Sequence, residues 1–192
     1  MTVVHFITHP EVVIEPGVSV PDWRLSHEGV RRTRLMLGRP WVRTVAAVFS
    51  SGERKAREAA HMLAGNLGLP CTAIPGLGEN DRSAIGYLPR DEFERVADEF
   101  FASPERSVRG WERAVDAQGR VVAAVKQAVP GVPVTGTVAV VSHGGVGALL
   151  SCHLKGVPIS RTEDQPGSGV GNVFSFDADT WTPLSTWSPI EE

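Results

Sequence analysis

Short apolar runs recur along the chain and alternate with longer segments in which apolar residues follow a helical period. Each short run is rich in β-branched or apolar residues and is bounded by polar or turn-forming residues, which predicts a β-strand. The run Val138–Val141 is apolar throughout, as is typical of a strand buried on both faces. The predicted strands span residues 3–8, 45–50, 71–74, 137–142, 173–177 and 181–187, with the last two at an edge of the sheet.

The segments between these runs predict helices, because their apolar residues fall on one face at a period of 3.6 residues. The first helix follows Ser26, whose hydroxyl can accept a hydrogen bond from an unpaired backbone N–H, and it stops at Gly38. The second runs from about Ala56 to Gly68, a residue that tolerates the left-handed conformation common at helix ends. Further helices are expected over residues 93–101, 115–129 and 144–154.

The alternation of strands and helices predicts an α/β fold, with three layers (α/β/α) and a mostly parallel central sheet. No repeat or linker interrupts the pattern, so we expect one domain over residues 1–192. In such sheets, ligands bind beyond the carboxyl ends of the strands. This rule selects the segments Thr8-His9-Pro10, Ser50-Ser51-Gly52 and Ser142-His143-Gly144.

The composition argues mainly against certain classes of protein. The 192 residues are 42% hydrophobic and 21% charged, with a net charge of −3, which gives no sign of the basic surface of a nucleic-acid binder. No apolar run approaches the roughly 18 residues of a membrane span, and the N-terminus lacks a signal-peptide pattern. The isolated Cys71 and Cys152 suit thiols in a reducing compartment. We therefore expect a cytoplasmic protein without nucleic-acid or membrane partners, and its oligomeric state stays open.

Two histidines stand directly after two predicted strands. His9 follows the first strand and His143 follows the strand over residues 137–142, so both belong at the same edge of the sheet. The basic residues Arg54, Lys55 and Arg57 open the helix after the second strand, and a helix N-terminus favours anions. A lone histidine is more often structural, and three basic residues alone often form a solvated helix face. Their coincidence at strand ends predicts an anion site.

A metal or nucleotide cofactor fits the sequence poorly. His5 and His9 are four residues apart, but a catalytic metal usually needs three protein ligands and no third is evident. The glycine-rich segment over residues 167–171 does not link an early strand to a helix, so we interpret it as a loop and not as a dinucleotide site. We therefore expect no metal and no cofactor.

The sequence resembles the histidine phosphatases, the phosphoglycerate-mutase-like superfamily, from residue 3 to about residue 177. In that family a strand ends in Arg-His-Gly, a helix begins with Leu-Thr-Glu-x-Gly, and a Ser-Ser-x-x-x-Arg-Ala-x-x-Thr-Ala segment follows. A Leu-x-Glu segment and a strand ending in Ser-His-Gly come later. The corresponding segments here are Thr8-His9-Pro10, Leu25-Ser26-His27-Glu28-Gly29, Ser50–Ala60, Leu77-Gly78-Glu79 and Ser142-His143-Gly144.

The resemblance implies roles for individual residues. His9 would accept the phosphoryl group, His143 would bind and polarise it, and Glu79 would protonate the leaving oxygen. These roles suit the residue types, because a neutral imidazole is a nucleophile near physiological pH and a covalent intermediate divides one difficult displacement into two. The expected phosphate-binding residues are Thr8, Arg54, Lys55, Arg57, Arg82 and Gly144.

Three positions depart from the family pattern. Thr8 and Lys55 replace two arginines, and Pro10 replaces a glycine, which removes a backbone N–H. Arginine grips phosphate with a planar fork, whereas lysine offers a compact charge and threonine offers none. Arg82, in the same loop as Glu79, is the best-placed replacement cation.

The sequence thus predicts a phosphohydrolase that cleaves a small phosphomonoester through a phosphohistidine on His9. Two alternatives stay open. The first is a catalytically degenerate member of the same fold that only binds a phosphorylated ligand. The second is a phosphotransferase of the phosphoglycerate-mutase type. The sequence does not name the substrate.

Overall fold

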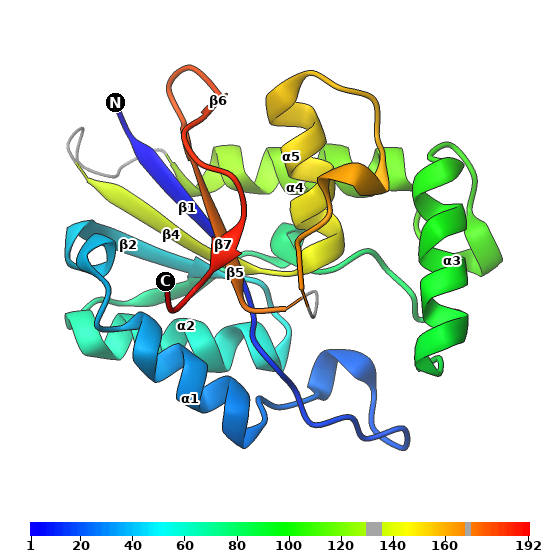
Figure 1. Ribbon diagram of the computed structural model, residues 1–192, viewed down its shortest axis with the longest axis horizontal. Helices are drawn as coiled ribbons and strands as arrows, with labels where there is room; N and C mark the ends of the chain where they lie inside the picture. Colours follow the sequence, from blue (N-terminus) through cyan, green and yellow to red (C-terminus); the bar gives the residue numbers. More distant parts are fainter. Residues whose placement is uncertain (130–135, 168–169) are drawn as a thin grey trace.

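The computed structural model describes residues 1–129, 136–167 and 170–192, and it contains a seven-stranded sheet flanked by helices (Figure 1). The strand order is β3-β2-β4-β1-β5-β6, and β7 also pairs with β5. The first four strands in the chain pair in parallel, whereas β5, β6 and β7 pair antiparallel. The strands are β1 (Val3–Thr8), β2 (Val45–Ser50), β3 (Cys71–Ala73), β4 (Thr137–Ser142), β5 (Asn172–Asp177), β6 (Thr182–Pro183) and β7 (Ser188–Pro189).

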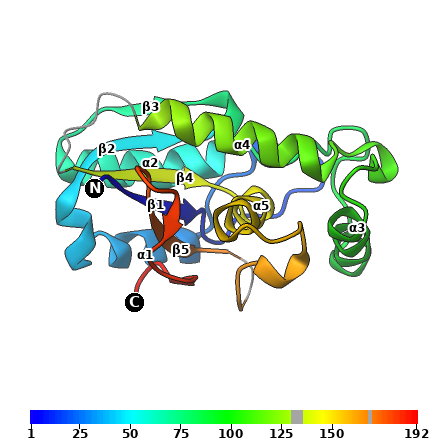
Figure 2. The same ribbon diagram turned by 90° about the horizontal axis from the view of Figure 1, so that it is seen from above.

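Helices cover both faces of the sheet, which confirms the three-layer prediction (Figure 2). Helices α1 and α2 lie on one face and α4 and α5 on the other, while α3 stands beyond the carboxyl ends of the parallel strands (Figure 1). The α-helices are α1 (His27–Met36), α2 (Arg54–Leu67), α3 (Arg90–Ala102), α4 (Ala114–Ala128) and α5 (Gly144–Lys155). Short 3-10 helices are η1 (Val20–Asp22), η2 (Pro40–Thr44), η3 (Pro75–Leu77), η4 (Val108–Gly110) and η5 (Arg161–Glu163).

Strand alternation divides the core into two clusters. Phe6 and Val140 face the cluster that contains α3, α4 and α5, whereas Ile7 and Val141 face the cluster that contains α1 and α2. Strand β4 is buried along its whole length, as its apolar run predicts. The sheet therefore holds β1 and β4 side by side at its centre, with their carboxyl ends at one edge.

Local capping follows the sequence. The Ser26 hydroxyl accepts a hydrogen bond from the Gly29 N–H at the start of α1, and Gly68 ends α2 with a φ of 66°. The strand expected over residues 181–187 is shorter than predicted, because only β6 and β7 pair near it. Pro183 and Pro189 cannot donate to a ladder, which limits both pairings.

Two further observations bear on the expectations from composition. Among the helices of the described residues, none combines the length and the hydropathy that a bilayer crossing requires. The glycine-rich segment is only partly described, because residues 168 and 169 lie outside the described residues.

Candidate active site

His9 and His143 meet at the carboxyl edge of the two central strands. The His9 backbone N–H donates to the Ser142 carbonyl at 3.1 Å, which extends the β1–β4 ladder by one residue. His143 directly follows β4 and caps α5. The centroids of the two imidazole rings are 5.1 Å apart, in an edge-to-face arrangement. The adjacency expected from the two strand ends is thus present.

The imidazole of His9 is held in one tautomer. Its Nδ1 atom lies 2.9 Å from the Pro10 carbonyl oxygen, and since a carbonyl only accepts, Nδ1 carries the proton and Nε2 keeps its lone pair. Burial, with a further contribution from the Lys55 ammonium, lowers the pKa of His9 to about 4. Pro10 therefore lacks a backbone N–H donor, but its carbonyl oxygen is the acceptor that orients the imidazole of His9.

His143 is more deeply engaged with the protein. Its Nε2 atom lies 2.7 Å from the Ser51 hydroxyl and 3.3 Å from Oε1 of Glu53. Burial sets the pKa of His143 well below its ordinary value, and the contact with Glu53 opposes this only in part. The Nδ1 atom is buried and has no hydrogen-bond partner among the described residues. The protein thus fixes one ring nitrogen of His143 and leaves the other, buried one without a partner among the described residues.

Glu53, a residue not singled out in the sequence, connects the groups around the histidines. Its carboxylate accepts a 2.5 Å hydrogen bond from Lys55 Nζ and another from the Glu79 N–H at 2.9 Å. Burial alone would raise the pKa of Glu53, but the neighbouring His143 and Lys55 lower it to about 2. The available sequence signal was its place directly before α2, inside the segment that carries the family resemblance.

Glu79 sits on the N-terminus of α5. Its carboxylate accepts hydrogen bonds from the Gly145 N–H at 3.1 Å and the Val146 N–H at 3.0 Å, a position that the helix dipole favours for a negative group. A Cβ atom at Gly145 would lie 2.7 Å from Oε1 of Glu79. The carboxylate can occupy this place only because residue 145 has no side chain.

Lys55 and Arg82 bring positive charge to the cavity beside His9. Lys55 is buried, and besides Glu53 it donates to the Val20 carbonyl at 2.9 Å. One guanidinium nitrogen of Arg82 lies 3.8 Å from Glu79 Oε2. The Arg82 guanidinium also stacks 5.0 Å from the ring centre of Phe93. His9, Lys55, Glu79, Arg82 and Gly144 all line one cavity of about 430 Å³.

Three of the expected phosphate-binding residues lie elsewhere. Arg54 pairs with Glu58 on the exposed face of α2 at 2.8 Å, and Arg57 is also exposed on that helix. The helical period explains this result, because only Lys55 of the three basic residues turns toward the sheet. Thr8 is buried and its hydroxyl donates to Gln165 Oε1 at 2.7 Å. None of the three lines the cavity.

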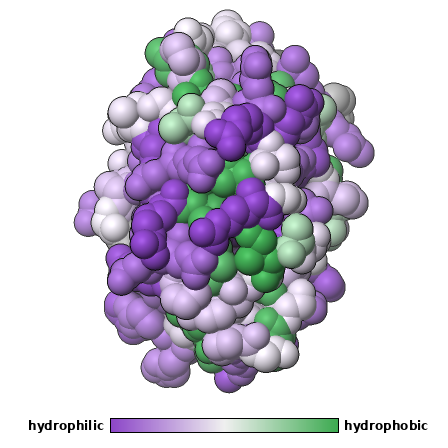
Figure 3. Space-filling model, turned by 90° about the vertical axis from the view of Figure 1, so that its right-hand side faces the viewer, coloured by the Kyte–Doolittle hydropathy of each residue, from purple (hydrophilic) through white to green (hydrophobic). Residues whose placement is uncertain are grey.

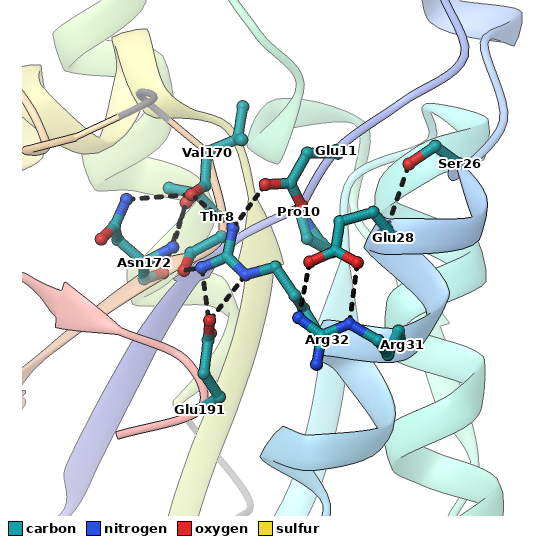
Figure 4. A network of polar contacts seen from close by, with 12 residues as sticks. Thr8, Pro10, Glu11, Ser26, Glu28, Arg31, Arg32, Val170, Asn172 and Glu191 are labelled. Carbon is teal, nitrogen blue, oxygen red and sulfur yellow. Dashed lines mark hydrogen bonds and ion pairs between the residues drawn. The ribbon is translucent and has the colours of Figure 1, made fainter.

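The hydroxyl of Thr8 is part of the packing between β1 and β5, next to a network centred on Arg32 (Figure 4). Arg32 of α1 bonds the carboxylates of Glu11 and Glu191 at 2.9 and 2.8 Å, and it donates to the Gly171 carbonyl at 2.8 Å. This guanidinium ties the loop after β1 to the C-terminal segment. It is not among the residues that line the cavity.

The described part of the chain holds no group of three His, Cys, Asp or Glu side chains arranged for a metal ion. At this edge the neutral, oriented imidazole of His9, the cations of Lys55 and Arg82 and the carboxylate of Glu79 line one cavity. The imidazole of His143, with one unpartnered nitrogen, packs against His9.

Solved structures resemble the fold over nearly its whole length. A mycobacterial glucosyl-3-phosphoglycerate phosphatase in complex with inorganic phosphate has a TM-score of 0.77 and 19% identity, covering 99% of each chain. YhfR from Bacillus stearothermophilus has a TM-score of 0.76 and 24% identity, covering 95% of this chain and 94% of its own. A phosphoserine phosphatase mutant from Entamoeba histolytica in complex with phosphoserine has a TM-score of 0.73 and 17% identity, covering 100% of this chain and 98% of its own.

The comparison of sequences is more specific. No curated protein matches the chain. The family model of the histidine phosphatase superfamily (branch 1) matches residues 15–186. This match spans most of the chain and includes Lys55, Glu79 and His143, while His9 lies just before it. The chain therefore belongs to the histidine phosphatase superfamily.

Proposed function

We propose that this protein is a phosphohydrolase that cleaves phosphomonoesters through a phosphohistidine on His9. The observation that carries the proposal is the contact between His9 Nδ1 and the Pro10 carbonyl, which leaves Nε2 unprotonated beside the cavity. A neutral, oriented nucleophile is what a covalent mechanism requires. Because the pKa of His9 is about 4, the ring stays neutral across the physiological range.

The first step transfers the phosphoryl group to the protein. His9 Nε2 attacks phosphorus, and the bond from phosphorus to the ester oxygen breaks. Glu79, in its protonated form, gives its proton to the departing oxygen, which leaves as an alcohol. Glu79 lines the same cavity as His9, so the two groups can act on one substrate.

The second step restores the nucleophile. Water attacks the phosphohistidine, its proton passes to Glu79, and the bond between phosphorus and His9 Nε2 breaks to release inorganic phosphate. The transferring group carries charge on its equatorial oxygens, which donors and cations must offset. Lys55, Arg82 and the Gly144 N–H, which line the cavity, are the proposed partners, and His143 is a further proposed partner because its ring lies against that of His9.

A non-catalytic binding protein is the second candidate, and a specific observation favours it. Lys55, which stands where the family has an arginine, is already paired with Glu53, and Thr8 is turned to Gln165. Loss of one preorganised donor at such a centre typically costs about 10²–10³ in rate. A site with these contacts can hold a phosphate ester and turn it over slowly or not at all.

One experiment separates the two candidates. Wild-type protein and His9→Ala are assayed side by side on a panel of phosphomonoesters, and the wild type is rapidly quenched with labelled substrate. The hydrolase predicts turnover only in the wild type and an acid-labile phosphoryl group on His9. Turnover that survives in His9→Ala, or label on serine, would refute the mechanism. Binding without turnover in the wild type would establish the second candidate.

A further inference from the structure

The cavity beside His9 is larger and more apolar than a phosphate group requires. Its volume of about 430 Å³ falls within the roughly 300–1,000 Å³ of pockets that hold organic ligands of drug size. It extends from His9 to α3, and hydrophobic side chains are visible between hydrophilic ones on the face that carries this helix (Figure 3). The aromatic residues that line it are here called the aromatic wall, and they are Trp23, Tyr87, Phe93, Phe100, Phe101 and Trp111.

Two residues that line the cavity each hold a buried donor without a partner. Asn80 Nδ2 and Trp111 Nε1 have no hydrogen-bond partner among the described residues. Their residues are only 5% and 2% exposed, and both line the cavity. A buried donor left unpaired is costly, and native structures usually satisfy it. A ligand that brings an oxygen acceptor to this wall would supply the missing partner.

The charged residues on the same side of the cavity are largely committed to one another. Arg161 bonds the side chain of Glu94 and lies 3.5 Å from Asp164. Arg82 stacks over Phe93 and over Trp111, at 5.0 and 5.3 Å from the ring centres. An arginine in this position can contact the phosphate on one side while its plane continues the apolar wall on the other.

We infer that the cavity takes phosphate esters of ring-containing, largely apolar alcohols or phenols that carry an oxygen acceptor. The inference rests on the proposed function, since it places the phosphoryl group at His9 and the organic group against the aromatic wall. The rings of the wall supply apolar and stacking contacts. The unpaired N–H groups of Asn80 and Trp111 select for an acceptor oxygen. A small zwitterionic ester such as phosphoserine brings carboxylate oxygens but no ring to pack against the wall.

Binding to His9→Ala tests this inference without any catalysis. Titration calorimetry compares 4-methylumbelliferyl phosphate, which has fused rings and a lactone carbonyl, with 1-naphthyl phosphate, which has rings alone, and with O-phosphoserine. All three carry one phosphomonoester, so differences report on the organic group. We expect the first to bind at least about tenfold more tightly than phosphoserine, with the naphthyl ester between them. Equal or tighter binding of phosphoserine, or no binding of any ester, would overturn the inference.

Variants in the His9→Ala background assign the effect to the wall. Trp111→Phe keeps a ring but removes the N–H, and we expect it to abolish the advantage of the umbelliferyl over the naphthyl ester. Tyr87→Ala removes a ring at the rim of the cavity, where Tyr87 is 36% exposed, and should weaken the binding of both aromatic esters several-fold. Leu184→Ala, an exposed residue away from the cavity, is the control. Equal changes of ester affinity in Tyr87→Ala and in the control would count against contact between the aromatic wall and the organic group.

The outcomes distinguish this inference from the proposed function. A wild type that hydrolyses no ester, while His9→Ala shows the expected order of affinities, would refute the hydrolase and support the cavity's ligand class. Hydrolysis by the wild type, with phosphoserine binding most tightly to His9→Ala, would support the hydrolase and refute the ligand class.

Discussion

Two buried cations of this protein stand in similar surroundings but have different numbers of partners. Arg32 bonds two carboxylates and two carbonyls, all from segments that it holds together. Lys55 bonds one carboxylate and one carbonyl and lines the cavity beside His9. An ammonium has three donors, and described residues take two of those of Lys55. The difference indicates that Arg32 serves the fold, whereas Lys55 keeps capacity for a ligand.

The sharpest test of this comparison removes each charge in turn. Lys55→Met should lower kcat/KM by about 10²–10³, because a proposed phosphate-binding donor is lost, with only about 1–2 kcal/mol lost from the free energy of unfolding. Arg32→Met should cost about 3 kcal/mol of stability, since it leaves two partly buried carboxylates without their partner. Urea unfolding and steady-state kinetics on both variants measure the two effects. The comparison fails if Lys55→Met destabilises the protein as much as Arg32→Met.

Glu53 provides a second test, because it is paired with Lys55, a proposed phosphate-binding residue, and would compete with phosphate for its ammonium. Glu53→Gln keeps the shape of the side chain and removes its charge, so we expect inorganic phosphate to bind about tenfold more tightly, which corresponds to about 1.4 kcal/mol. Phosphate titration by calorimetry measures this change. Glu58→Gln, which removes a carboxylate from the exposed face of the same helix, is the matched control. Weaker phosphate binding in Glu53→Gln would show that Glu53 positions the cations and does not compete with phosphate.

The histidine pair predicts a pH dependence of stability. In the folded protein the pKa of His9 is about 4, against 6.5 for an ordinary histidine, and the pKa of His143 is lowered as well. As the pH falls from about 6.5 to 4, the unfolded chain takes up protons that the folded site does not, so the free energy of unfolding decreases across this window. Above pH 6.5 these groups contribute no further change. Urea unfolding at several pH values should show that the free energy of unfolding changes less with pH in His9→Gln than in the wild type. An equal change with pH in both proteins would contradict the role of burial.

The smallest expected effect concerns Thr8. Its hydroxyl accepts from the Asn172 N–H at 2.9 Å and donates to Gln165, so Thr8→Val should cost about 1–2 kcal/mol of stability. Turnover on a small ester should change by less than about threefold, because the hydroxyl does not line the cavity. A loss of turnover as large as that in Lys55→Met would return Thr8 to the phosphate-binding residues.

The fold was largely predictable because its signals are local. Apolar runs such as Val138–Val141 and caps such as Ser26 and Gly68 act within a few residues of the structure that they specify. The strand expected over residues 181–187 was wrong in extent, because apolar content outweighed Pro183, which cannot donate to the ladder. The mixed direction of the sheet also required tertiary contacts that no single segment encodes.

The site was predictable only in part, for a geometric reason. Strand order brings His9 and His143 together, and the carboxyl-edge rule anticipates this. Which of three adjacent basic residues faces the cavity depends on the rotation of α2, and that rotation selects Lys55 over Arg54 and Arg57. Glu53 was missed because an acidic residue is not expected beside the cations of an anion site. Its partners come from segments distant in the sequence, as its contact with Glu79 shows.

The close approach of Gly145 to Glu79 limits how this sequence can vary. The two residues lie 66 positions apart in the chain, yet a methyl group at residue 145 would occupy the space of the Glu79 carboxylate. An alanine there would require the Glu79 carboxylate to shift from its present place at the helix terminus, whereas a shorter aspartate at position 79 would retreat from it. The two positions are therefore coupled, so that a redesign of this active site has to choose both residues together.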